Sequence, residues 1–224
     1  NFLNNKNSFF IPNPSDKAFE TLNNFNNSCN VDVFFALSHG VHRGVLKSGK
    51  IDGRITFLKN LVNITPDVKF DIYGIDKVQP IWADHYFKTI MNAKMGLNLS
   101  RGDAIKYYSS DRITQIVGNG IVCLIDEKTQ YSNFFNNDEM IFYKNSNDLS
   151  EKIAKISQDE KLRKKIGKKG KEKYTKYFNS NLVARYILEK TFDIPAITPI
   201  KKKQIINNGL VSNQLSKRNP IVEP

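Results

Sequence analysis

The chain has 224 residues, of which 40% are hydrophobic and 11% aromatic, and this excludes an intrinsically disordered protein. No window approaches about 18 consecutive apolar residues, which excludes a transmembrane helix, and two cysteines are too few for a disulfide framework. The excess of 34 Lys and Arg over 22 Asp and Glu gives a net charge of +12, which favours phosphates, anionic membrane surfaces or nucleic acid as partners.

Composition divides the chain into three regions. Residues 1–30 contain ten Asn, and Pro12 and Pro14 interrupt regular structure, so we expect a linker with a short helix over 15–23. Residues 31–192 carry the hydrophobic pattern of a domain, and 193–224 are expected to form a flexible basic tail. The start at Asn1, without Met or a charged leader, leads us to expect an excerpt of a longer protein and no secretory signal.

Short apolar runs alternate with helical spacing along the domain. We predict strands over 31–37, 68–73, 95–99, 121–125 and 139–143, and helices over 51–63, 79–92, 107–118, 148–157, 158–178 and 180–192. This order predicts an α/β fold: a Rossmann-like parallel sheet flanked by helices, with a C-terminal helical segment and a flexible tail. Ligands of such sheets bind where the strands end, near helix N-termini.

The loop after the first predicted strand, 38–50, is rich in glycine and basic residues. Gly40 allows a close backbone turn, and Arg43 and Lys47 supply charge for a phosphate. The spacing matches no established phosphate-binding motif, so a polar surface loop remains an alternative. His39 and His42 are candidate acid–base groups or solvated side chains, and without a third ligand we expect no metal site.

The loop that follows the third predicted strand contains a second candidate site. Ser109, Ser110 and Asp111 are candidate N-caps, and the amides of the following helix could equally receive a phosphate. Basic residues lie close to them in sequence: Arg101, Lys106 and Arg112. Capping explains the Ser/Asp cluster, and a phosphate site would also explain the basic residues.

The basic residues also cluster in 161–176, which contains nine Lys and Arg. A solvated helix face is the simplest interpretation. Peripheral contact with an anionic membrane is the functional alternative.

Several blocks of the sequence together resemble the C-terminal half of GT-B-type group 1 glycosyltransferases, in the branch of spore-coat-maturation glycosyltransferase-like proteins. The resemblance runs from about Phe10 to Phe192. Its blocks are Phe-Ile-Pro-Asn-Pro at 10–14, the basic loop at 38–50, Phe-Asp-Ile-Tyr-Gly at 70–74, Met-Gly-Leu-Asn-Leu-Ser at 95–100, Ser-Asp-Arg-Ile-Thr-Gln-Ile-Val-Gly-Asn-Gly at 110–120, and the helical finish from Asp148.

The resemblance implies two Rossmann-like domains facing a cleft, with the nucleotide-sugar held mainly by this half. It implies that Arg43 and Lys47 contact the donor diphosphate, and that residues 74–76 line the base pocket. Where the family often has a ribose-binding Glu this chain has Gln115, and the upstream acidic position falls on Tyr107. Asp103 and Asp111 are both candidates to replace the missing carboxylate. The expected donor-binding residues are Gly40, Arg43, Lys47, Gly74, Ile75, Asp76, Ser100, Arg101, Ser109, Ser110, Arg112 and Gln115.

We therefore expect the donor-binding half of an enzyme that transfers a hexose from a nucleoside-diphosphate sugar to a hydroxyl of a glycan, lipid-linked glycan or protein in cell-envelope glycan biosynthesis. The acceptor domain is expected outside this chain, and no cofactor or metal is expected. We expect a cytoplasmic protein, with 161–176 a candidate for contact with the inner face of the membrane. The alternatives are a non-catalytic glycosyltransferase-like domain and a nucleic-acid-binding α/β module, although the sequence contains no nucleic-acid motif.

Overall fold

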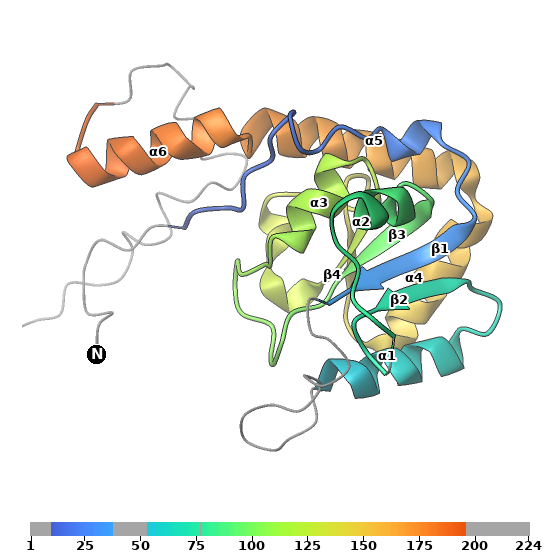
Figure 1. The fold of residues 1–224 in the computed structure, drawn as a ribbon. Helices are drawn as coiled ribbons and strands as arrows, with labels where there is room; N and C mark the ends of the chain where they lie inside the picture. Colours follow the sequence, from blue (N-terminus) through green and yellow to red (C-terminus); the bar gives the residue numbers. More distant parts are fainter. Residues whose placement is uncertain (1–9, 38–52, 77, 196–224) are drawn as a thin grey trace, which may run out of the picture.

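The computed structural model describes residues 10–37, 53–76 and 78–195 (Figure 1). Five parallel strands form one sheet in the order β2-β1-β3-β4-β5, which confirms the predicted α/β fold. The strands are β1 (Val31–Ala36), β2 (Phe70–Tyr73), β3 (Ala93–Asn98), β4 (Val122–Asp126) and β5 (Ile141–Tyr143). Most of their residues are buried, as expected for a parallel sheet with helices on both faces.

Six α-helices accompany the sheet in the described part of the chain. They are α1 (Gly53–Ile64), α2 (Ala83–Ile90), α3 (Arg112–Gly118), α4 (Ser146–Gln158), α5 (Glu160–Tyr177) and α6 (Ser180–Phe192), with 3-10 turns at Asn24–Asn26, Glu127–Thr129 and Tyr131–Asn133. Apolar residues of α1 and α4 pack on one face of the sheet, and those of α2 and α3 pack on the other. None of these helices is long and apolar enough to cross a membrane.

The strand order places a topological switch point between β1 and β3. Val33 of β1 lies opposite Phe70 of β2 on one side and opposite Met95 of β3 on the other. The chain therefore leaves β1 in one direction through α1 and leaves β3 in the other through α3, and these helices cover opposite faces. Doubly wound sheets bind their ligands at the carboxyl ends of the strands that flank such a point, here β1 and β3, and we call this region the crevice.

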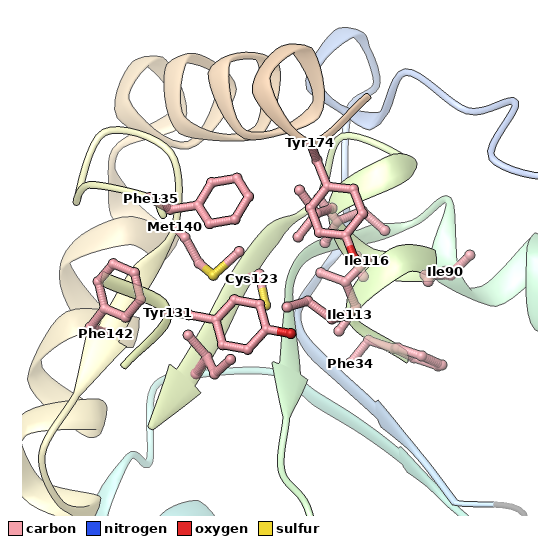
Figure 2. Packing of buried hydrophobic residues seen from close by; sticks show 14 of the residues in the cluster. Phe34, Ile90, Ile113, Ile116, Cys123, Tyr131, Phe135, Met140, Phe142 and Tyr174 are labelled. Atoms are coloured by element: carbon pink, nitrogen blue, oxygen red, sulfur yellow. The ribbon is translucent and has the colours of Figure 1, made fainter. Parts of the chain in front are cut away.

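The larger core cluster fills the space between the sheet and the helices α2, α3 and α5 (Figure 2). Phe34 and Cys123 project from the strands toward Ile113 and Ile116 of α3, and Tyr174 approaches from α5. Gly96 lets α3 lie close to β3, because a Cβ there would come within 2.6 Å of the Ile116 side chain. This close packing fixes the position of α3, whose first turn reaches the crevice.

The segment from residue 10 to residue 27 runs beside α5 (Figure 1). The helix predicted over 15–23 is wrong: these residues form a turn followed by extended chain, and the 3-10 turn lies at Asn24–Asn26. The Asp16 carboxylate accepts hydrogen bonds from the Ala18 amide (2.9 Å) and the Ser180 hydroxyl (2.7 Å). These contacts bind the segment to the start of α6 and outweigh its local helical signal.

Candidate functional site

Arg112, the first residue of α3, lies at the switch-point crevice and joins its two sides. Its Nε donates to the carbonyl oxygen of Ala36 at the end of β1 (3.1 Å), and its Nη1 donates to that of Leu99 after β3 (3.3 Å). The guanidinium also stacks over the Phe35 ring, 4.8 Å from its centroid. The positive charge of Arg112, which the sequence analysis associated with the loop after β3, is thus held at the ends of β1 and β3.

Burial of the Arg112 guanidinium lowers its pKa, and the nearby positive charge of Arg54 lowers it further, while Tyr86 and Asp111 act in the opposite direction. Arg54 belongs to the first turn of α1 and is only 8% exposed. Two cations from the first turns of α1 and α3 are therefore concentrated near the crevice. An anionic ligand beside Arg112 would offset this unfavourable environment.

Arg54 is absent from the residues predicted from sequence, although a signal for it exists. It precedes Leu58 and Leu61 by four and seven residues, and all three are buried. A charged residue at a core-facing position of an amphipathic helix stands out against the pattern of its neighbours.

Ser109 and Ser110 reach the crevice, but they do not cap α3. Asn98, the last residue of β3, donates to the Ser109 hydroxyl (2.8 Å) and accepts from that of Ser110 (3.3 Å). Ser110 Oγ in turn accepts from Arg112 (3.2 Å). Of the three N-cap candidates, Asp111 does occupy the N-cap position, but its side chain makes no capping hydrogen bond.

The predicted helix over 107–118 begins five residues later than expected. Tyr107 has a positive φ of 60°, and its amide donates to the carbonyl of Thr129 (2.7 Å), which is incompatible with a helical start there. Its ring packs against Phe10 and Phe134, at centroid distances of 5.5 and 5.0 Å. Tyr107 thus supports the loop after β3. In this chain an uncharged residue therefore stands where the family pattern has an acidic one.

Gln115, one turn after Arg112 on α3, accepts a hydrogen bond from the hydroxyl of Tyr86 on α2 (2.7 Å). Burial raises the pKa of the Tyr86 phenol, and the positive charge of Arg112 opposes this shift. Tyr86, Arg112 and Gln115 therefore form one cluster between α2 and α3. Tyr86 is a second residue that the sequence prediction missed.

The other predicted residues at this edge of the sheet are less closely associated. Gly74 (φ 79°) turns the chain after β2, and Ile75 is buried with 5% exposure. Asp76 pairs with Lys59 of α1 (3.0 Å), so its carboxylate is engaged on the α1 side. Ser100 is half-buried and Arg101 is exposed. Asp103 and Asp111, the candidate replacements for the missing carboxylate, are both exposed.

The predictions for the loop after β1 lie outside the described residues. They concern Gly40, Arg43 and Lys47, together with His39 and His42. In the described parts of the chain, no group of three or more His, Cys, Asp or Glu side chains could hold a metal ion. Arg112, whose hydrogen bonds span the ends of β1 and β3, suits an anion, and the nearest described carboxylate is that of the exposed Asp111.

The basic residues of α5 are largely engaged within the molecule. Lys165 and Lys169 pair with Asp138 (3.5 and 2.9 Å), and Lys173 pairs with Glu139 (2.7 Å). Lys171 donates to the carbonyl of Leu22 (2.6 Å) and thereby anchors the N-terminal segment. Much of the local charge thus has a structural use.

Comparison with known families matches residues 54–189 to a family described as glycosyl transferase-like. The chain belongs to this family. The match begins at Arg54 and includes the whole cluster of Tyr86, Arg112 and Gln115. It confirms the resemblance to glycosyltransferases. No curated protein sequence matches the chain.

Solved structures confirm the fold of this glycosyltransferase-like chain. TarM superposes with a TM-score of 0.52 at 15% identity, over 81% of this chain and 37% of TarM. A mutant of S. aureus TarM, in complex with fondaparinux, alpha-GlcNAc-glycerol and UDP, gives a TM-score of 0.50 at 16% identity, over 83% of this chain and 38% of that one. The chain thus spans little more than a third of the length of either structure.

Proposed function

We propose that the chain is the donor-binding part of a glycosyltransferase that transfers a hexose from a nucleoside-diphosphate sugar to a hydroxyl of a glycan, lipid-linked glycan or protein. The observation that carries the proposal is the position of Arg112. It lies at the switch point and is partly buried, and both burial of its guanidinium and the nearby charge of Arg54 lower its pKa. A diphosphate has the negative charge and the multiple acceptor oxygens that suit such a guanidinium group.

During transfer, negative charge develops on the departing diphosphate. Arg54 and Arg112 are fixed by α1 and α3 before the ligand arrives, so little reorganisation accompanies the reaction. The family membership and the UDP in the TarM complex support a nucleotide ligand. In this proposal the acceptor binds between this chain and a further domain.

The order of the strands supports an assignment for the base of the nucleotide. Gly74 and Ile75 come after β2, one strand away from the crevice, and form one wall of the proposed base pocket. Gln115 faces the ribose in place of a carboxylate.

A cytoplasmic location at the inner face of a membrane is part of the same proposal, and the exposed Lys161 and Lys168 of α5 stay available for that contact.

The test is binding of nucleoside diphosphates to the chain and to its Arg112→Met variant. A thermal-shift panel of UDP, GDP, ADP and CMP identifies the base, because ligand at 100 times its Kd adds about 2.7 kcal/mol, or roughly 5–11 °C in Tm for a domain of this size. We expect Arg112→Met to weaken the best nucleotide by about 10- to 100-fold in isothermal titration, since charged hydrogen bonds contribute about 1.5–3 kcal/mol.

Lys168→Met is the matched control, because it removes an exposed cation of α5 and should leave the affinity unchanged. A flat panel with folded wild-type chain contradicts the proposal. Equal affinities of wild type and Arg112→Met would remove Arg112 from the site. Nucleotide binding without sugar transfer by a protein that contains the further domain would favour a non-catalytic glycosyltransferase-like role.

A further inference from the structure

Tyr86 of α2 is partly buried and packs against the larger core cluster through aromatic contacts. Its ring meets that of Phe34 on β1 edge-on, at a centroid distance of 5.4 Å and an angle of 82°. This contact fixes the ring, so the position of its hydroxyl group is fixed as well. The hydroxyl makes one hydrogen bond within the described residues, to Gln115 Oε1.

This bond accompanies one orientation of the Gln115 amide. The Tyr86 hydroxyl donates to the amide oxygen, and the amide nitrogen lies on the opposite side of the amide group. Among the described residues, the Gln115 nitrogen has no hydrogen-bond partner. This nitrogen is not fully buried, so a ligand can reach it. The side chain therefore has two N–H donors available to a ligand.

Gln115 follows Arg112 by three residues, so both project from the same side of α3. We infer that Tyr86 is a positioning residue of the nucleotide site: by binding the Gln115 oxygen, it directs the amide nitrogen to donate to a ribose hydroxyl of the bound nucleoside diphosphate. The inference rests on the proposed function. It explains how a neutral side chain serves where a ribose-binding carboxylate is missing, since a ribose hydroxyl accepts as well as donates.

Without the Tyr86 hydroxyl, the amide can rotate by half a turn and present its oxygen instead. Tyr86→Phe keeps the ring contact with Phe34 and removes only the oxygen. We expect this variant to bind the nucleoside diphosphate about five-fold more weakly, the range of one neutral hydrogen bond. Gln115→Ala should weaken binding by a similar factor.

The double variant distinguishes positioning from an independent contribution. If Tyr86 acts through Gln115, then Tyr86→Phe changes nothing further in the Gln115→Ala background. The probe is the nucleoside diphosphate with the largest thermal shift, titrated alongside its 2′,3′-dideoxy form. The losses should appear with the ribonucleotide and disappear with the dideoxy nucleotide, which a general structural defect would not produce.

Tyr143→Phe is the matched control. Tyr143 is 2% exposed, packs on the other face of the sheet, and its hydroxyl has no hydrogen-bond partner within the described residues. Its removal should leave nucleotide affinity unchanged. Additive losses in the double variant, equal losses with the dideoxy nucleotide, or full affinity of Tyr86→Phe would overturn the inference while the proposed function stands. A wild-type chain that binds no nucleotide would overturn both.

Discussion

Two arginines in different regions of this molecule, the buried Arg163 and the partly buried Arg112, have different partners. Arg163 of α5 is 1% exposed and forms an ion pair with Glu160. It also donates to the carbonyl oxygens of Asn24 (3.0 Å) and Asn27 (2.8 Å). Arg112, at the crevice, donates only to neutral oxygens within the described part of the chain.

The difference indicates what each charge does. Arg163 has a carboxylate of its own, so its charge is compensated and its hydrogen bonds fasten the N-terminal segment to α5. Arg112 is desolvated, and among its described contacts the only carboxylate influence is that of the exposed Asp111, while Arg54 repels it. A partly buried cation that lacks a paired carboxylate is a candidate site for an anionic ligand. The comparison thus separates a structural arginine from a ligand-binding one.

The largest effect should come from Arg163→Met. The substitution removes the guanidinium donors to the Asn24 and Asn27 carbonyls and the ion pair with Glu160 from a buried position, and we expect a loss of about 3 kcal/mol in the free energy of unfolding. Urea unfolding measures this loss. The folded variant should bind nucleotide with the wild-type affinity, and a weakened nucleotide affinity would break the comparison.

Arg54→Met should show the opposite behaviour. We expect about a ten-fold loss of affinity for pyrophosphate and nucleoside diphosphate, equivalent to about 1.4 kcal/mol, with a smaller change in stability. Removal of one of two repelling cations offsets part of the lost hydrogen bonding. Isothermal titration with pyrophosphate and urea unfolding give the two quantities. A large loss of stability with unchanged affinity would place Arg54 with Arg163 as a structural residue.

Sequence patterns were sufficient to predict the sheet. Runs such as Val31–Ala36 and Val122–Asp126 are buried on both faces, so they read as continuous apolar strands without any tertiary information. The failures occur where a distant contact overrides a local preference. Tyr107 takes a left-handed conformation because its amide meets Thr129, and the turn at Asp16 forms because Ser180 contacts its carboxylate.

The candidate site could be predicted only in part, for the same reason. Arg112 lies in a recognisable block that follows a strand, so its position at the crevice follows from the fold. Tyr86 could not be found, since its partner Gln115 is 29 residues away and no motif links the two. Arg54 carried a signal in its core-facing helical position, but a buried arginine is also typical of a structural residue such as Arg163.

The smallest effect sharpens the comparison through pH. The hydrogen bond from Arg163 holds the pKa of Glu160 below its ordinary value of 4.5, so the ionised carboxylate is favoured in the folded state. The resulting stability is present above that value and is lost as the pH falls through the lower pKa of the folded protein. Glu160 is 46% exposed, so solvent screening limits the contribution to below about 1 kcal/mol.

Glu160→Gln should therefore be less stable than wild type in urea unfolding at neutral pH, and the difference should vanish in acid. Glu172→Gln, an exposed change on the same helix, is the matched control for the loss of one negative charge. A Glu160→Gln defect that persists unchanged in acid would mean that the charge of Arg163 is not compensated by Glu160, and the contrast with Arg112 would then lose its basis.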